Sequence, residues 1–231
     1  MKNRNWALAI VVLLLLLGGS AWYLMRDGQS PASIVTGDAS RDTGVASDER
    51  HIFGNPKAPV TVIEYAALTC PHCAEFNEHV MPTLKSKYID TGKVFYVFRV
   101  LPISPADFKA EGLAVCQSKE RYLETVDTLY RRQNEWGPMQ MEEHVPDMNA
   151  QPKTDAGLMK IGSDMGLDAE KARSCMHDYT LHQAVEKVAS EGALRYGITS
   201  VPSLIVNGKA MDAPHTAEEL DKLLTPLLEG K

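Results

Sequence analysis

Residues 60–73 read VTVIEYAALTCPHC, and this stretch decides the fold. Its first six residues are β-branched and largely apolar, which predicts a buried strand. Pro71 then opens a helical pattern that runs to about Ile89, and Pro is tolerated at a first helical position because its missing N–H would be unpaired there. We therefore expect Cys70 and Cys73 at the point where a strand passes into a helix.

The segment that follows completes a strand–helix–strand unit. Pro82 should interrupt the helix because it lacks an N–H donor and its ring clashes with the preceding turn. Residues 93–100 (KVFYVFRV) predict a second strand. A strand, a helix and a second strand in this order are typical of a parallel crossover.

The end of the chain predicts a hairpin and a helix. Ser203–Val206 and Lys209–Asp212 are short strand patterns separated by Asn207-Gly208. Asn-Gly is the strongest short hairpin signal, because both turn positions tolerate positive φ. Residues 216–228 then have leucines at helical spacing, which predicts a closing amphipathic helix.

Between these two units, residues from about 106 to 178 read as a helical insertion. Apolar side chains recur there at helical spacing, and Asp168 is placed to cap a helix that starts just after it. The positions are Tyr122, Leu123, Val126, Leu129, Tyr130, Leu158, Ile161 and Met165, with Leu181, Val185 and Val188 continuing beyond the insertion. The order β-α-β, helical block, β-β-α predicts an α/β fold.

The first 28 residues predict a targeting segment. Trp6–Met25 has no charge, and about 20 apolar residues are long enough to span a bilayer. Lys2 and Arg4 precede the run, so the N-terminus should stay in the cytoplasm. An uncleaved signal anchor is favoured, and a signal peptide cleaved near 19–21 is the alternative. We expect the body on the periplasmic side of the inner membrane, or in the soluble periplasm after cleavage.

Charge and composition set further limits. The 231 residues hold Lys+Arg 24 and Asp+Glu 30, a net charge of −6. Residues 1–30 carry a net +2, so the remainder carries −8, and so acidic a body excludes a basic nucleic-acid footprint. Residues 29–50 are rich in Ser, Gly, Asp and Ala, which is typical of a flexible linker. The folded part should be 51–231.

The cysteine pair carries the chemistry. A cysteine at a helix N-terminus meets unpaired N–H groups and the positive end of the helix dipole, which favour its thiolate. His72, if protonated, adds to this effect. A Cys-x-x-Cys motif also occurs at zinc sites, but zinc would need a second ligand pair that the spacing of Cys116 and Cys175 does not supply. A purely structural Cys70–Cys73 disulfide would gain little from closing so small a loop.

These residues resemble a known family. Residues 51–231 are similar to the DsbA-like thiol-disulfide oxidoreductases, which have a thioredoxin fold with an inserted helical domain. The marks are the CPHC motif at 70–73, the dipeptide Val201-Pro202 before the last hairpin, and Glu64 on the strand that enters the motif. The fold class implied is α/β, a thioredoxin fold with a helical insertion at about 106–178.

The resemblance also implies a peptide-binding groove beside the pair. Pro71, Val201 and Pro202 would contact substrate, with Pro202 cis and lying against the disulfide. The alternative is an ordinary strand-start proline. The redox-active disulfide takes the place of a bound cofactor. Electrons would pass on to a DsbB-like, quinone-linked membrane reoxidase.

The predicted site residues have distinct roles. Cys70 is the nucleophile and should be the exposed member of the pair, while Cys73 is the resolving thiol, one turn deeper. His72 tunes the thiol, the alternative being an incidental surface histidine. A carboxylate in a Val/Ile-rich strand would be buried with a raised pKa, so Glu64 is predicted to carry the Cys73 proton. The alternative is that Glu64 is a solvated side chain on an edge strand.

Two cysteines lie in the insertion. In an oxidising compartment we expect Cys116 and Cys175 to form a structural disulfide. The alternative is two buried free thiols that behave as small hydrophobic side chains. No metal is expected.

The favoured function is a protein disulfide oxidase that acts on reduced or unfolded exported proteins. CPHC with Val before the proline looks more like the oxidase branch than the isomerase branch. An isomerase or reductase on the same fold is the alternative. Isomerases of this kind usually dimerise through an N-terminal domain, whereas only a short tether precedes this fold, so we expect a monomer. A non-enzymatic chaperone or metal-binding module is the third hypothesis.

Overall fold

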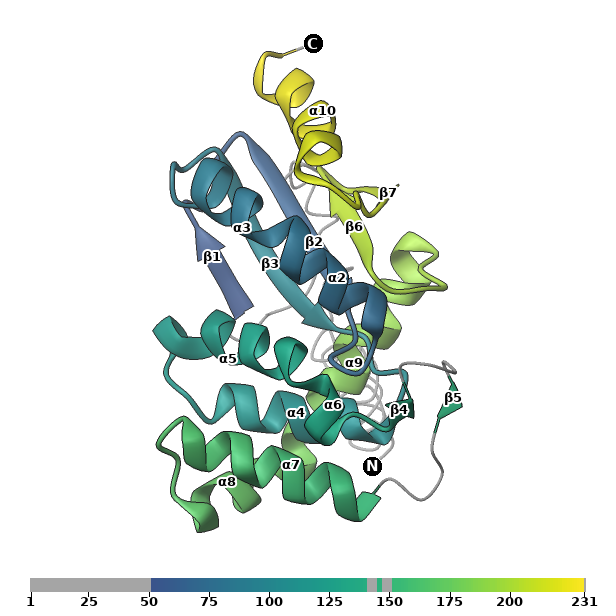
Figure 1. Cartoon of the computed structure of the whole chain (residues 1–231). Helices are drawn as coiled ribbons and strands as arrows, with labels where there is room; N and C mark the ends of the chain where they lie inside the picture. Colours follow the sequence, from purple (N-terminus) through teal and green to yellow (C-terminus); the bar gives the residue numbers. More distant parts are fainter. Residues whose placement is uncertain (1–50, 141–144, 147–150, 231) are drawn as a thin grey trace, which may run out of the picture. The chain divides into compact units, whose positions relative to one another are not determined.

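The computed structural model describes residues 51–140, 145–146 and 151–230. In this part of the chain the strands form a sheet of order β1-β3-β2-β6-β7 (Figure 1). They are β1 Ile52–Gly54, β2 Val60–Ala66, β3 Val94–Val100, β6 Ser203–Val206 and β7 Lys209–Asp212. β2 and β3 are parallel, and the other neighbours are antiparallel. The predicted parallel crossover from β2 to β3 is confirmed. The three-residue strand β1 pairs with β3 and forms one edge of the sheet.

The central strand, β2, is buried along its whole length. It lies between β3 and β6, and alternate side chains enter two separate cores. Val60 and Val62 join the larger core, while Ile63 and Tyr65 join a smaller one on the other face. Coverage of both faces explains why β2 reads as a nearly continuous apolar run.

Helices cover the face of the larger core. After β2 come α2 Pro71–His79, α3 Met81–Thr83 and the π-helical segment η2 Leu84–Ile89. The break between α2 and α3 confirms the interruption expected at Pro82. The closing helix α10, Ala217–Leu228, adds Leu220 and Leu224 to the same core.

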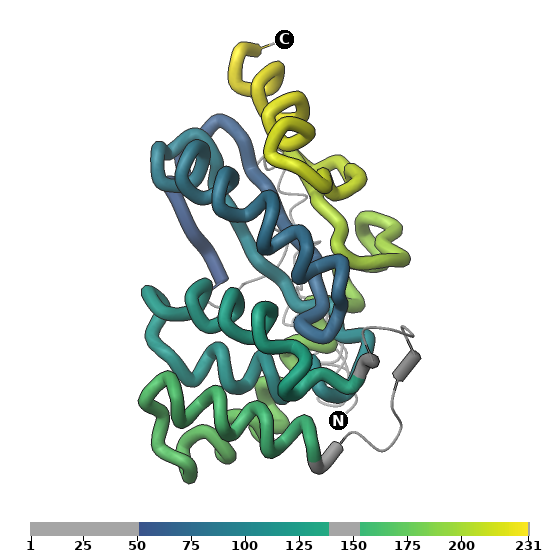
Figure 2. The backbone as a smooth tube through the Cα atoms, viewed as in Figure 1, coloured from purple at the N-terminus to yellow at the C-terminus, as the bar shows by residue number. Residues whose placement is uncertain are grey.

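A helical block joins the end of β3 to the last helix before the hairpin. Figure 2 shows its helices stacked in layers. They are α4 Pro105–Val115, α5 Lys119–Arg131, α6 Gln133–Trp136, α7 Gln151–Asp164 and α8 Ala169–Met176. A small hairpin, β4 Met139–Gln140 and β5 Val145–Pro146, lies between α6 and α7. The helices occupy the stretch where the sequence predicts an insertion.

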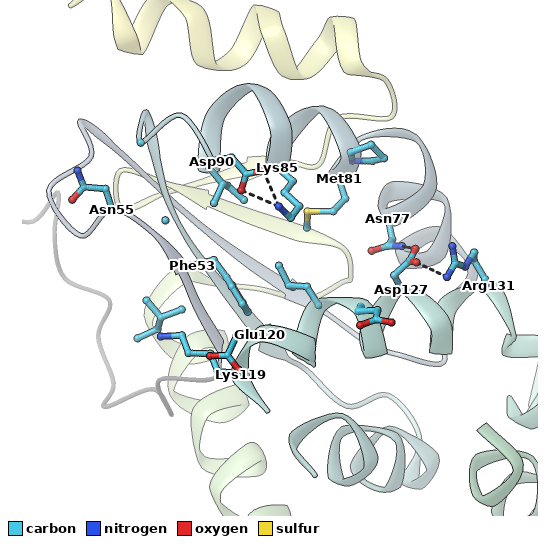
Figure 3. Close-up of a pocket in the computed structure, with 17 residues that line it drawn as sticks. Phe53, Asn55, Asn77, Met81, Lys85, Asp90, Lys119, Glu120, Asp127 and Arg131 are labelled. Atoms are coloured by element: carbon cyan, nitrogen blue, oxygen red, sulfur yellow. Dashed lines mark hydrogen bonds and ion pairs between the residues drawn. The ribbon is translucent and has the colours of Figure 1, made fainter. Parts of the chain in front are cut away.

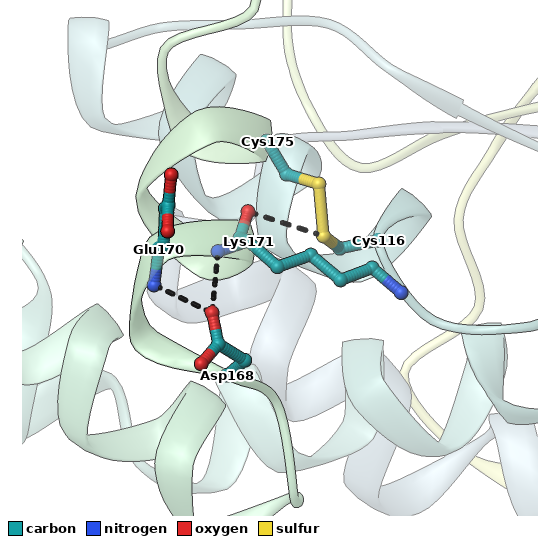
Figure 4. The surroundings of a disulfide bond; sticks show 5 residues. All are labelled: Cys116, Asp168, Glu170, Lys171 and Cys175. Carbon is teal, nitrogen blue, oxygen red and sulfur yellow. Dashed lines mark hydrogen bonds between the residues drawn. A yellow bond between two sulfur atoms is a disulfide. The ribbon is translucent and has the colours of Figure 1, made fainter.

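Helix ends and a turn in and after the block form where nearby residues favour them. Asp168 accepts hydrogen bonds from the N–H groups of Glu170 and Lys171, so the predicted cap is confirmed (Figure 4). The long helix α9, Tyr179–Tyr196, ends at Gly197, whose φ of 66° suits glycine. Asn207 and Gly208 take φ of 48° and 80° and connect β6 to β7, as predicted.

A disulfide joins two helices of the block. Cys116 caps the C-terminus of α4 and is bonded to Cys175 in α8, with the Cα atoms 5.9 Å apart (Figure 4). The helices approach so closely that a Cβ built on Gly112 would lie 2.3 Å from the Cys175 carbonyl oxygen. The bonded Cys116 sulfur also lies 3.6 Å from the Lys171 carbonyl oxygen, although as a disulfide it has no proton to donate.

The predicted targeting segment (1–28) and the predicted linker (29–50) lie outside the described residues. Within the described ranges, no helix has the length and apolar character needed to cross a membrane.

Candidate active site

The cysteine pair sits where β2 passes into α2. Cys70 is the N-cap of α2, with an extended backbone (φ −82°, ψ 123°). Its N–H donates to the Ala67 carbonyl at 3.1 Å, and its own carbonyl accepts the Ala74 N–H at 3.2 Å. Cys73 follows within the first turn of the helix. Both cysteines are free thiols, so the structure represents the reduced state.

The expectation that Cys70 is exposed is wrong. Its side chain is only 6% exposed, against 0% for Cys73. Cys70 is still the more accessible of the two, but the loop before β6 covers it, and its Sγ lies 3.8 Å from the Val201 carbonyl oxygen. The family resemblance implies that Val201-Pro202 lies beside the pair, but not that this loop, which arrives from 131 residues away, buries Cys70.

Local hydrogen bonds favour the thiolate of Cys70. The thiol of Cys73 donates to it, and the backbone N–H groups of Cys73 and His72 also point at it. These bonds, helped by the charge of His72, outweigh the burial that opposes ionisation, and the pKa of Cys70 falls from 9.0 to about 6. Cys70 is therefore mostly thiolate at neutral pH.

Cys73 behaves in the opposite way. Its pKa is raised well above 9.0, first by burial, then by its hydrogen bond to the Cys70 sulfur and by the charges of Cys70 and Glu64. The pair thus divides into a thiolate and a protonated thiol, which is the arrangement needed by a nucleophile and its resolving partner.

Glu64 lies in the central strand and is 1% exposed. Its Oε2 accepts a hydrogen bond from the Tyr96 hydroxyl at 2.7 Å. Burial raises its pKa from 4.5 to about 7, and the Tyr96 bond lowers it only in part. The alternative of a solvated edge strand is wrong, because β2 has a neighbour on both sides.

The raised pKa of Glu64 predicts how stability depends on pH. Below pH 4.5 the carboxyl is protonated in both the folded and the unfolded chain. Between pH 4.5 and about 7 only the unfolded chain releases the proton, so the folded state loses about 3 kcal/mol by pH 8. We expect Glu64→Gln to raise the free energy of unfolding by up to about 3 kcal/mol at pH 8 and to change it little at pH 4.

Urea unfolding of the reduced protein at both pH values would measure this effect. Glu218→Gln, at an exposed position on α10, is the matched control and should change stability little at either pH. An equal gain from Glu64→Gln at pH 4 and pH 8 would show that titration of this carboxyl is not the cause.

The loop before β6 faces the cysteines. The Val201–Pro202 peptide bond is cis, as expected. A pocket of 230 Å³ opens beside it, lined by one side of α2, by Pro202 and by residues 213–215. His72 lies at this pocket with its side chain 62% exposed, and its Nδ1 is 3.2 Å from Glu75. Pro71 is buried at the first helical position.

Sequence reasoning missed three buried side chains at this site. Asp107, Tyr130 and Gln133 all hydrogen-bond to the turn that leads into Cys70. Asp107 had a local signal, since it completes a capping box with Ser104 at the start of α4. The helical spacing marks Tyr130 as a core side chain, but no local signal links Tyr130 or Gln133 to this turn, because their partners there lie 63 to 65 residues away.

A larger pocket of 980 Å³ lies away from the cysteines, between β1, the α2–η2 segment and α5 (Figure 3). Phe53, Met81 and Leu123 give it an apolar part, and the ion pairs Lys85–Asp90 and Asp127–Arg131 border it. None of the predicted site residues lines this pocket.

Comparisons with known proteins agree with this geometry. The sequence profile of the thioredoxin family matches residues 46–225. A protein of Rickettsia typhi named as a protein-disulfide oxidoreductase is 28% identical over 68% of this chain and 54% of its own length. Disulfide bond formation protein D of Bacillus cereus is 27% identical, over 90% of both chains.

A cysteine-to-alanine variant of Wolbachia pipientis alpha-DsbA1 has a similar structure. The TM-score is 0.69 at 23% identity, covering 84% of this chain and 96% of that one, so the likeness concerns the fold. The chain spans about half the length of the Rickettsia protein that it matches.

Proposed function

This chain belongs to the thioredoxin family, and we propose that it is an exported thiol-disulfide oxidoreductase that donates the Cys70–Cys73 disulfide to folding proteins outside the cytoplasm. The observation that carries the proposal is the unequal pair: a Cys70 sulfur that favours the thiolate beside a Cys73 sulfur that favours the thiol. A stable Cys70 thiolate stabilises the reduced form, which makes the disulfide a strong oxidant.

The reaction starts from the oxidised enzyme. A substrate thiolate attacks the Cys70 sulfur, the Cys70–Cys73 bond breaks, and Cys73 leaves with the electron pair. A second substrate thiolate then attacks the substrate sulfur of the mixed disulfide, and Cys70 leaves as a thiolate. The substrate loses two electrons and gains a disulfide, and the enzyme gains those two electrons.

Glu64 supplies the proton that this scheme needs. The departing Cys73 is buried and strongly favours its thiol, so it must take up a proton away from bulk water. We assign that proton to the Glu64 carboxyl, which has a pKa of about 7 and acts electrostatically on Cys73; it would give the proton in this direction and receive it during reoxidation.

The loop before β6 would hold the substrate. An extended segment whose cysteine reaches Cys70 passes the Val201 backbone, which already lies 3.8 Å from the Cys70 Sγ. The pocket beside Pro202 would receive a side chain next to the reacting cysteine. Val201 and Pro202 are the residues assigned to this contact, whereas Pro71, which was expected to share it, is buried.

Location and recycling follow from the same proposal. The apolar run of residues 6–25 after Lys2 and Arg4 supports export, and a disulfide at Cys116–Cys175 suits an oxidising compartment. Every cycle leaves the enzyme reduced, so an electron acceptor must restore it. We assign this step to a quinone-linked membrane reoxidase.

The reduction potential of the Cys70–Cys73 pair tests the proposal. The full chain is equilibrated with glutathione buffers, and the state of this pair is read by alkylation and peptide mass, separately from Cys116–Cys175. We expect a value near that of DsbA, about −120 mV. A value near that of thioredoxin, about −270 mV, would overturn disulfide donation and favour a reductase.

A further inference from the structure

A buried side-chain amide bonds twice to the turn that leads into Cys70. Gln133, at the start of α6, is 6% exposed. Its Nε2 donates to the Leu68 carbonyl at 2.7 Å and to the Cys70 carbonyl at 3.1 Å. One side-chain NH₂ group therefore links the carbonyls on both sides of Thr69.

Two further side chains of the helical block hold the same turn. Asp107 accepts the Thr69 N–H at 2.8 Å and the Thr69 hydroxyl at 3.0 Å. The Tyr130 hydroxyl donates to the Ala67 carbonyl at 3.4 Å. Residues 67–70 are thus each bonded to the block, and the backbone of the turn depends on the block for its orientation.

We propose that Gln133 is a positioning residue that sets the reactivity of Cys70, by holding the Leu68 and Cys70 carbonyls toward the block so that the Cys70 sulfur faces the N–H groups of α2. The thiolate gains from those N–H groups only while Cys70 keeps its N-cap geometry. Without the amide, the Leu68 carbonyl would be buried with no donor in its place, and the turn would shift toward water to satisfy it.

The test uses Gln133→Met, because Met has nearly the shape of Gln but no donor. The reduced full chain is alkylated with iodoacetamide between pH 4 and pH 9, and the rate at Cys70 is followed by peptide mass. We expect the midpoint of the rate profile to move to higher pH, so that the rate at pH 5.5 falls about threefold or more while the rate at pH 9 stays the same.

Thr125→Val is the matched control. Thr125 is likewise a buried polar residue of the block, on α5, but its hydroxyl donates to the Arg121 carbonyl of its own helix and not to the turn. Its profile should coincide with that of the parent protein. An equal shift in Thr125→Val would assign the effect to general loosening of the block and overturn the role of Gln133.

An unchanged midpoint in a folded Gln133→Met protein would also overturn the proposal. If that variant does not fold, Gln133→Asn replaces it: the shorter amide cannot reach both carbonyls, so we expect a smaller shift in the same direction, and no shift would be contrary evidence. The effect of Gln133 on the reactivity of Cys70 does not depend on the proposed function. Only the consequence for disulfide transfer rests on that function. Alkylation needs no substrate or reoxidase, so a failed oxidase assay leaves this test intact.

Discussion

Replacing Cys70 by Ser is expected to abolish disulfide transfer, with a rate at least about a thousandfold below that of the parent protein. Both steps of the proposed reaction break or form a bond at the Cys70 sulfur, and a hydroxyl forms no disulfide. Cys73 cannot take over, because it is 0% exposed and strongly favours its protonated form.

The measurement is the loss of free thiols from a reduced, unfolded substrate protein mixed with the pre-oxidised enzyme. Cys73→Ser is the informative companion. Cys73→Ser keeps the Cys70 sulfur but cannot be pre-oxidised, so this variant is mixed instead with a substrate protein that carries a disulfide. The Cys70 thiolate should attack that bond, release one substrate thiolate and accumulate a mixed disulfide that the enzyme itself cannot resolve. A Cys70→Ser protein that still supports folding as well as the parent would instead favour the non-enzymatic chaperone hypothesis.

The parts of this site that the sequence predicts all have local signals. The strand through Glu64, the helix opened by Pro71 and the turn at Asn207-Gly208 are each encoded within a few residues. The position of Glu64 in a Val/Ile-rich strand was enough to predict its burial and raised pKa, since both depend on the two covered faces of that strand.

What the sequence does not predict depends on contacts between distant segments. The turn before Cys70 is hydrogen-bonded by Asp107 and Gln133, which lie in the helical block. A polar side chain on a predicted helix is usually solvated, and nothing near Gln133 in the sequence marks it as buried. The short β1 was missed because three residues are too few for a periodic pattern.

Removing the disulfide, as Cys116→Ala with Cys175→Ala, is expected to lower the free energy of unfolding by about 4 kcal/mol. The bond closes a separation of 59 residues, and the loss of loop-closure entropy in the unfolded chain accounts for that figure in the chain-entropy model. Urea unfolding with the Cys70–Cys73 pair kept reduced in both proteins would measure it. Ser174→Ala, exposed on the same helix α8, should stay within about 0.5 kcal/mol of the parent.

The loss of stability should leave the active site almost unchanged at temperatures where the variant is folded. Cys116 ends α4, whereas Asp107 contacts the Cys70 turn from the first turn of that helix, about 13 Å away along the axis. Alkylation of Cys70 in the double-alanine protein should therefore keep the parent pH profile. A shifted profile would mean that the disulfide fixes the position of α4 relative to the Cys70 turn. The fall in stability would then come partly from a change in the folded state, in addition to the entropy of the unfolded chain.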